Sequence, residues 1–88
     1  GISANGDGRN DYMIIDCIDY FPNNHVTIYN RDGALVWETD SYDNIGVRFD
    51  GTGNVGRQGL KLPTGTYFYF IDKGDGSPKV QGYLELVR

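Results

Sequence analysis

Residues 25–39, HVTIYNRDGALVWET, decide the fold of this chain. Apolar and polar residues alternate from Val26 to Tyr29, which is the period of a β-strand with one buried face. Asp32 and Gly33 then predict a tight turn, because this pair tolerates the positive φ angles of hairpin turns. An apolar run follows from Ala34, so the stretch predicts a β-hairpin with a short connection.

Similar patterns outside the hairpin predict five more short strands. No stretch shows helical periodicity, and polar segments rich in glycine separate the strands; residues 1–11 and 51–59 are predicted to be loops. About seven strands with regular turn signals are typical of an all-β sandwich. The predicted strands span residues 12–18, 25–30, 34–39, 46–50, 60–62, 66–72 and 79–87.

Length and charge narrow the range of functions. The chain has 88 residues, which suffice for one domain with a modest core. Its formal net charge of −4 argues against nucleic acid and anionic membrane surfaces as partners. No apolar run is long enough to cross a bilayer, so we expect no membrane insertion. The chain begins without Met, and we expect it to be a piece of a larger protein.

The residue types needed for catalysis are scarce. Cys17 is the only cysteine and His25 the only histidine, so an internal disulfide is impossible. We expect Cys17 to be a half-buried thiol on a strand. A glycosidase would need two carboxylates fixed across a cleft, for which one small sandwich has little room. The sequence therefore predicts a non-catalytic domain.

Four segments together resemble the gliding-motility-associated C-terminal domain, the type B sorting domain of the type IX secretion system. Each segment is weak alone, but all four occur in the family's order and cover nearly the whole chain. Two departures are Ala4, where the family usually has proline, and a longer loop between Asp50 and Leu62. The segments are ISANGDGRND (2–11), VTIYNRDG (26–33) with LVW (35–37), YDN (42–44) with FDG (49–51), and LPTGTYFY (62–69) continuing to GYLELVR (82–88).

This resemblance implies an immunoglobulin-like antiparallel β-sandwich. It implies that residues 1–88 form a single C-terminal sorting domain on a larger protein of the Bacteroidota. That protein would pass through the type IX secretion translocon to the cell surface or the medium. A PorP/SprF-like outer-membrane protein is the implied partner, and any catalytic chemistry would lie in upstream domains.

The first loop contains oxygen ligands in a spacing that partly matches a calcium loop. The candidate ligands are Ser3, Asn5, Asp7 and Asp11. However, Ser3 replaces the usual first aspartate, and Ile14 stands where a bidentate glutamate belongs. Turn capping by the Asn and Asp side chains is the favoured interpretation, and no cofactor is expected.

Aromatic residues occupy both faces of the strand at residues 66–72. Tyr67, Tyr69 and Ile71 share one face, and Phe68 and Phe70 share the other. One face must be core, while the other would be covered or form an aromatic platform for a sugar. The alternative function is therefore a carbohydrate-binding or adhesive module, which calcium would stabilise if the first loop binds it. A structural spacer is a third.

Further residues are assigned to recognition or structure. The recognition candidates are Arg31, Tyr69, Tyr83 and Arg88, chiefly because of the resemblance; ordinary solvated surface is the alternative for each. Tyr67 after Pro63 and Gly65 resembles a tyrosine corner, whose hydroxyl binds backbone near the strand entry. Gly33 in the hairpin turn and Trp37 on the returning strand complete the structural set.

Overall fold

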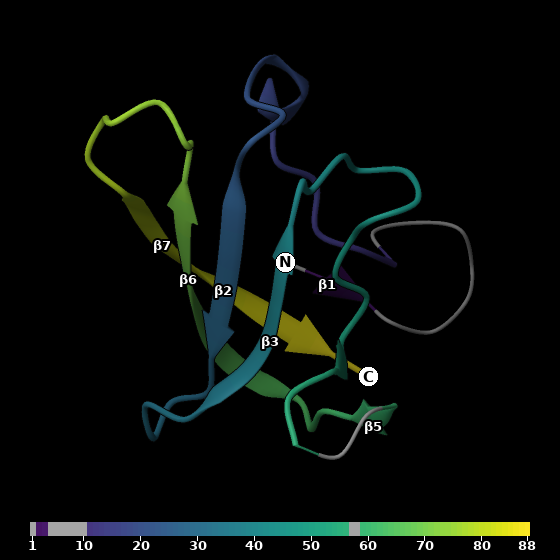
Figure 1. Cartoon of the computed structure of the whole chain (residues 1–88). Helices are drawn as coiled ribbons and strands as arrows, with labels where there is room; N and C mark the ends of the chain where they lie inside the picture. The colour runs from purple at the N-terminus through teal and green to yellow at the C-terminus, as the bar shows by residue number, and fades with distance from the viewer. Residues whose placement is uncertain (1, 4–10, 57–58) are drawn as a thin grey trace.

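The computed structural model describes residues 2–3, 11–56 and 59–88 and contains two β-sheets (Figure 1). A single short 3-10 helix, η1, is the only helix among these residues. The elements are β1 (Ile2–Ser3), η1 (Ile18–Tyr20), β2 (His25–Tyr29), β3 (Leu35–Asp40), β4 (Thr52–Gly53), β5 (Leu60–Lys61), β6 (Gly65–Asp72) and β7 (Val80–Val87).

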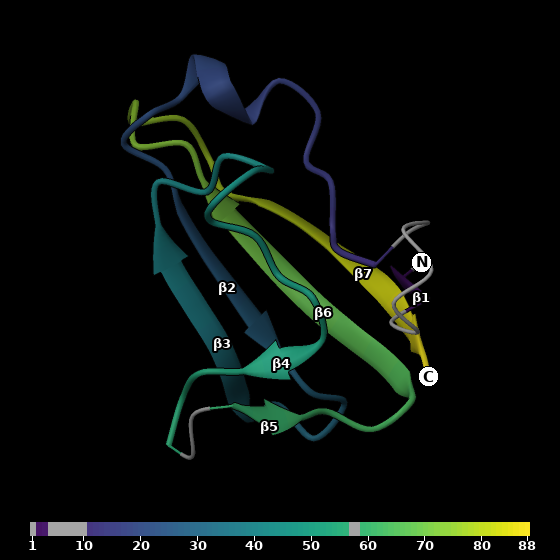
Figure 2. The ribbon, with the colours of Figure 1, turned by 90° about the vertical axis from the view of Figure 1, so that its right-hand side faces the viewer.

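The larger sheet has the strand order β1-β7-β6-β2-β3, and β4 and β5 form the smaller sheet. The predicted hairpin is present as β2 and β3, with Ile28 opposite Trp37. Figure 2 looks onto the second layer, in which β4 and β5 lie in front of the larger sheet. The all-β prediction is confirmed, and the arrangement is consistent with an immunoglobulin-like sandwich. One strand pair differs from the predicted antiparallel arrangement: β1 runs parallel to β7.

Two predicted strands are wrong, and both fall in the second layer. Residues 12–18 form bends and a turn that leads into η1, and residues 46–50 are also irregular. Met13 and Ile18 are buried, whereas Ile14 between them is 63% exposed, so the segment does not follow the period of a strand. Cys17 is exposed and adopts a φ of 64°, which ends any extended conformation. The expected half-buried strand thiol is therefore also wrong.

Two predicted loops contain short strands. In the first loop, Ile2 and Ser3 pair with Leu86 and Val87, and the Ile2 side chain is buried in the core. In the second, Thr52 and Gly53 form β4. Both strands have only two residues, which is too short for an alternating pattern to identify them.

Asparagine side chains replace part of the missing strand pairing in the second layer. The Asn24 amide accepts from the Tyr42 backbone N–H at 2.8 Å and donates to the Tyr42 carbonyl at 3.1 Å. The Asn44 amide pairs with Ile15 in the same way, at 2.8 Å in both directions. These bonds satisfy backbone groups that an irregular segment would otherwise leave without partners.

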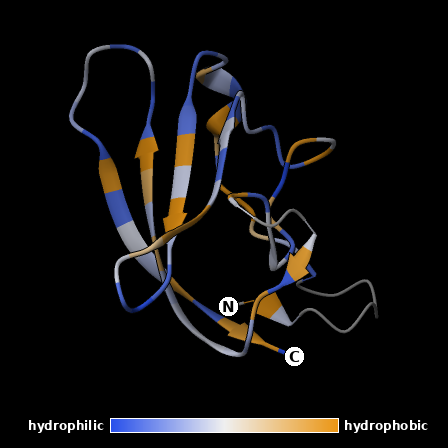
Figure 3. Ribbon diagram, turned by 60° about the horizontal axis from the view of Figure 1, so that its bottom comes forward, coloured by the Kyte–Doolittle hydropathy of each residue, from blue (hydrophilic) through white to orange (hydrophobic). Residues whose placement is uncertain are grey.

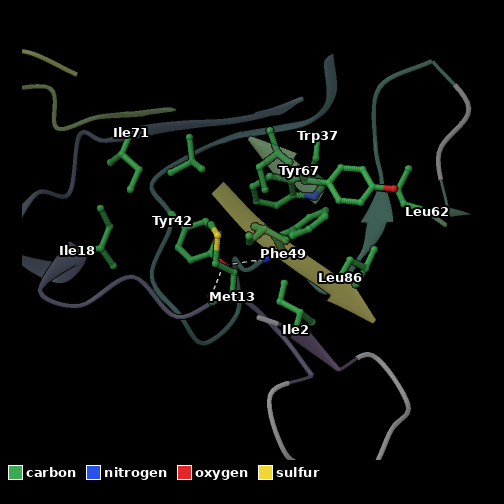
Figure 4. Close-up of a cluster of buried hydrophobic side chains, with 13 residues drawn as sticks. Ile2, Met13, Ile18, Trp37, Tyr42, Phe49, Leu62, Tyr67, Ile71 and Leu86 are labelled. Atoms are coloured by element: carbon green, nitrogen blue, oxygen red, sulfur yellow. Dashed lines mark hydrogen bonds between the residues drawn. The ribbon is translucent and has the colours of Figure 1, made fainter. Parts of the chain in front are cut away.

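The core lies between the larger sheet and the irregular segments (Figure 4). Trp37 from β3 makes edge-to-face contacts with Tyr42 and Phe49, whose ring centroids lie 5.7 Å and 5.4 Å away. Hydrophobic and hydrophilic bands alternate along the long strands in Figure 3, as expected for a sheet with one buried face. The opposite face of the sheet therefore presents its own set of side chains.

Candidate recognition surface

The outer face of the larger sheet presents aromatic side chains. Tyr29 on β2 is opposite Phe68 on β6, and Phe68 is opposite Tyr83 on β7, so the three form one row across the sheet. Phe68 is 44% exposed and Tyr83 is 67% exposed. Large aromatic groups in a contiguous exposed row mark interaction sites more often than scattered ones do.

A groove of about 630 Å³ lies along this row. Three of the four predicted recognition residues, Arg31, Tyr69 and Tyr83, line it together. The sequence prediction did not include Tyr29, Phe68 and Phe70 among the recognition residues. Their alternation with core residues was visible in the sequence, but it did not reveal which face the second layer leaves open. The remaining lining residues are Asn30, Gly33, Gln81 and Gly82.

The groove continues into a second hollow of about 350 Å³ along the same face. Tyr29 and Phe70 line both hollows, and their rings meet edge to face with centroids 5.7 Å apart. Beyond them, the His25 imidazole Nδ1 lies 2.7 Å from the Asp40 carboxylate. The face therefore changes from aromatic near the hairpin turn to charged at the other end of β2.

Asn30 fixes the turn that carries Arg31. Its side-chain oxygen accepts from the backbone N–H groups of Asp32 and Ala34, at 3.0 Å and 2.9 Å. Gly33 takes the positive φ of 85° that the turn requires, as predicted. Among the residues that the structure describes along the groove, Arg31 alone is charged. The acidic domain thus places the Arg31 guanidinium beside the aromatic row, and Lys79 lines the adjoining hollow together with Tyr29 and Phe70.

Tyr69 borders the groove as a residue of β6, but its side chain lies on the core face of that strand, where it is half-buried and packs against the core. Its cross-strand partner is Gly82 on β7, and a Cβ atom at Gly82 would collide with the Tyr69 ring. The absence of a side chain at Gly82 therefore gives the ring its place beside the sheet.

Arg88 lies away from the groove and has a structural contact. Its guanidinium donates to the backbone carbonyls of Leu62, at 2.8 Å, and Gly51, at 2.5 Å. Its backbone N–H also donates to the Thr64 hydroxyl at 3.0 Å. These bonds tie the end of β7 to the second layer, so the structure does not bring Arg88 together with the other recognition candidates.

The tyrosine-corner geometry is present at Tyr67. Its hydroxyl donates to the Pro63 carbonyl at 2.7 Å, across the turn that leads to Gly65 at the start of β6. Burial raises the pKa of Tyr67, and the charge of Arg88 partly opposes that shift. Trp37 is buried on the opposite side of the sheet from the groove.

The calcium prediction falls largely outside the described residues. Asn5 and Asp7 lie in the part that the structure does not describe, while Ser3 belongs to β1. Elsewhere, carboxylates organise turns: Asp43 accepts from the N–H groups of Ile45 and Val47, both at 2.9 Å. These hydrogen bonds lower the pKa of Asp43. Residues 2–3, 11–56 and 59–88 contain no group of three or more potential metal ligands.

Comparison with known families identifies the domain. Residues 1–86 match the CHU_C type IX secretion signal domain. The chain belongs to this family. A search of curated proteins found no match to the chain, and neither did a search of solved structures.

Family membership establishes the domain as a sorting signal of the type IX secretion system. The resemblance seen in the sequence is thereby confirmed. A type IX signal is recognised by the secretion system and marks its protein for the cell surface or for release. Within the described part of the chain, no helix has the length and apolar character needed to cross a bilayer.

Proposed function

We propose that the secretion system reads this signal through the aromatic groove, and that a PorP/SprF-like outer-membrane protein makes the contact. The observation that supports this most directly is the gathering of Arg31, Phe68 and Tyr83 in one groove. Tyrosine and arginine are enriched among residues that carry binding energy at protein interfaces.

The sheet gives this surface a defined shape. Phe68 and Phe70 lie on β6, which is paired on both sides by β2 and β7. The Asn30 hydrogen bonds fix the turn that carries Arg31. A surface held by strand pairing loses little conformational freedom on binding, which favours recognition of the folded domain. The groove forms only when strands distant in sequence come together.

We further propose that the domain is non-catalytic and that its passenger carries any chemistry. A signal domain needs only to be bound, and the groove presents aromatic, amide and guanidinium groups with no carboxylate pair. Calcium binding at the first loop stays a separate proposal. It is tested by whether calcium raises the unfolding temperature of the domain, and whether Asp7→Ala and Asp11→Ala remove that effect.

Export of a reporter tests the role of the groove. A reporter enzyme fused upstream of residues 1–88 is expressed in a type IX-competent host, and its surface and periplasmic fractions are measured. Tyr83→Ser and Arg31→Ala are expected to lower the surface fraction, with the reporter retained in the periplasm. Tyr20→Ser is the matched control, because Tyr20 is 75% exposed but lies outside the groove. Lys61→Ala on β5 is the control for loss of a cation.

Unchanged export of both groove variants would refute the groove as the recognition surface. An equal loss of export in the groove variants and in the two control variants would indicate damage to the fold. Thermal melts of the isolated domain would detect such damage. The aromatic lining also supports the carbohydrate-binding alternative, because sugar rings stack on exposed aromatic groups. Saturable glycan binding that Tyr83→Ser removes, with export unchanged, would favour that alternative.

A further inference from the structure

Two cations on the outer face of the larger sheet have no counter-charge. Arg31 lines the groove at the hairpin turn, and Lys79 lines the adjoining hollow directly before β7. Both side chains are exposed. In the part of the chain that the structure describes, the only ion pairs are those of His25 with Glu38 and Asp40. The charges of Arg31 and Lys79 are therefore stabilised by water alone.

Most of the other described cations are engaged within the fold. Arg48 and Lys73 each lie over an aromatic ring, at 4.0 Å and 5.2 Å from its centre. Arg88 donates to two backbone carbonyls of the second layer. Lys61 is the exception, but it lies on β5 in the smaller sheet and does not line the groove. A domain with a net charge of −4 thus leaves two free cations on its aromatic face.

The two cations lie on opposite sides of the aromatic row. Arg31 comes two residues after Tyr29, whereas Lys79 comes four residues before Tyr83. Four residues in an extended strand span about 13 Å. Because β6 lies between β2 and β7, a line from one cation to the other crosses the face of β6 diagonally. An extended segment of about seven residues can therefore reach both cations.

A partner that covers the rings between the two cations also removes water from both charges. Burial of a charge is unfavourable unless an opposite charge or several hydrogen bonds replace the lost water. Asp72 lines the same hollow as Lys79, but its carboxylate accepts from the Gly74 backbone N–H at 2.9 Å and forms no ion pair with Lys79. The partner itself must therefore supply the counter-charges.

We propose that the partner occupies this face with an extended acidic segment of its polypeptide chain. One carboxylate of the segment pairs with Arg31, a second pairs with Lys79, and apolar side chains cover the rings between them. The proposal rests on the proposed function, because it takes the groove as the surface that the secretion system binds. Charge complementarity then provides specificity, since an acidic segment is attracted to this face and a basic segment is repelled.

The arrangement of the rings favours a polypeptide over an acidic polysaccharide. Tyr29 and Phe70 meet at an interplanar angle of 87°. Two rings at right angles form a corner that takes a single apolar side chain, whereas successive sugar rings need a flat aromatic platform. Because Tyr29 and Phe70 line both hollows, this corner lies where the hollows join, between the two cations.

Binding of short peptides to the full 88-residue chain tests the charge requirement. The probes are the acetylated and amidated peptides EPVWVPE, QPVWVPQ and KPVWVPK, which differ only at their two ends and whose prolines favour an extended backbone. NMR titration of the isotope-labelled chain gives the affinity and the binding face. The acidic peptide is expected to bind roughly tenfold or more tightly than the basic peptide, and added salt to weaken its binding.

Charge-reversal variants test whether the two cations provide this preference. Arg31→Glu and Lys79→Glu are each expected to weaken binding of the acidic peptide roughly tenfold. Lys61→Glu makes the same charge change away from the groove and should leave the affinity unchanged. Neither Arg31 nor Lys79 forms an ion pair within the described part of the chain, so these variants should fold, and thermal melts verify this.

Three results would overturn the acidic segment as the occupant. One is equal binding of the three peptides, and another is no binding of the acidic peptide at millimolar concentration. The third is tighter binding of polygalacturonate than of the acidic peptide, lost in Arg31→Glu, which would assign the face to an acidic polysaccharide.

Export of the reporter separates this inference from the proposed function. Arg31→Glu and Lys79→Glu are expected to lower the surface fraction, while Arg31→Lys and Lys79→Arg keep the charges and should support export. If Tyr83→Ser lowers export but neither charge reversal does, the groove remains the recognition surface and the acidic segment is refuted. If none of these three variants lowers export, both proposals fail.

Discussion

The Tyr42 hydroxyl accepts a hydrogen bond from the backbone N–H of Phe49 at 2.9 Å and donates one to the carbonyl of Met13. Met13 and Phe49 also pair directly through their backbones at 2.8 Å. One side chain thus joins two irregular segments that are distant in sequence. The second layer depends on this junction, because neither segment forms a strand there.

Tyr42→Phe is expected to destabilise the domain by roughly 2–4 kcal/mol, because it leaves two buried backbone groups without a partner. Urea unfolding followed by tryptophan fluorescence measures the change through Trp37, which contacts the Tyr42 ring. Tyr20→Phe is the control, since Tyr20 is largely exposed. A loss below about 0.5 kcal/mol, the usual range of a surface change, would contradict the proposed importance of this junction.

Alkaline pH provides an independent test of the same residue. Burial raises the pKa of Tyr42 from 10.0 to about 12, although the Phe49 hydrogen bond acts in the opposite direction. The raised pKa means that the fold favours the neutral phenol. This contribution is complete below the unfolded pKa near 10.0 and is lost as the pH rises through about 12. The stability difference between wild type and Tyr42→Phe should therefore narrow over that window, and a constant difference would contradict the shift.

We expect the side chain of Asn24 to be essential to the fold, and the side chain of the neighbouring Asn23 to contribute little. Asn24 is buried and pairs with both backbone groups of Tyr42, whereas Asn23 is exposed. Asn24→Ala should cost roughly 2–4 kcal/mol, since it removes partners of buried groups. Asn23→Ala should change the free energy of unfolding by less than about 0.5 kcal/mol. Similar losses for the two variants in urea unfolding would argue against this assignment.

Two glycines of the β6–β7 loop provide a matched pair. Gly74 and Gly76 have φ angles of 76° and 84°, so an alanine at either position is strained by roughly 1–2 kcal/mol. A Cβ atom at Gly74 would also collide with the backbone of Asn23, while the space around Gly76 is open. Gly74→Ala is therefore expected to lower the unfolding temperature clearly more than Gly76→Ala. Equal shifts would show that the loop moves away from Asn23 without loss.

The hairpin could be predicted because its information is local. Val26, Ile28 and the Asp32-Gly33 turn lie within a few residues of one another, and their pattern is sufficient. β6 and the final strand were predicted for the same reason. The second layer depends instead on pairs such as Asn44 with Ile15, which are separated by 29 residues. No periodicity encodes such a pair, and the strand predicted at residues 12–18 was wrong for this reason.

The groove could be predicted in part. Arg31, Tyr69 and Tyr83 were named from the sequence, but nothing in the local pattern placed them in one groove. That placement depends on the register that sets Phe68 opposite both Tyr29 and Tyr83. Arg88 was named on the same grounds, and its bonds to Leu62 and Gly51 assign it to the fold. These carbonyl partners are distant from Arg88 in the sequence, so the local pattern around Arg88 could not predict them.

The most direct test of the recognition proposal is photo-crosslinking during export in a type IX-competent host. A photoreactive phenylalanine analogue is placed at Tyr83 in the groove or at Tyr20 on η1, and covalent adducts are identified by mass spectrometry. The account predicts an adduct with the PorP/SprF-like outer-membrane protein from Tyr83 and none from Tyr20. An adduct with that protein from Tyr20 alone, or equal adducts from both positions, would contradict it.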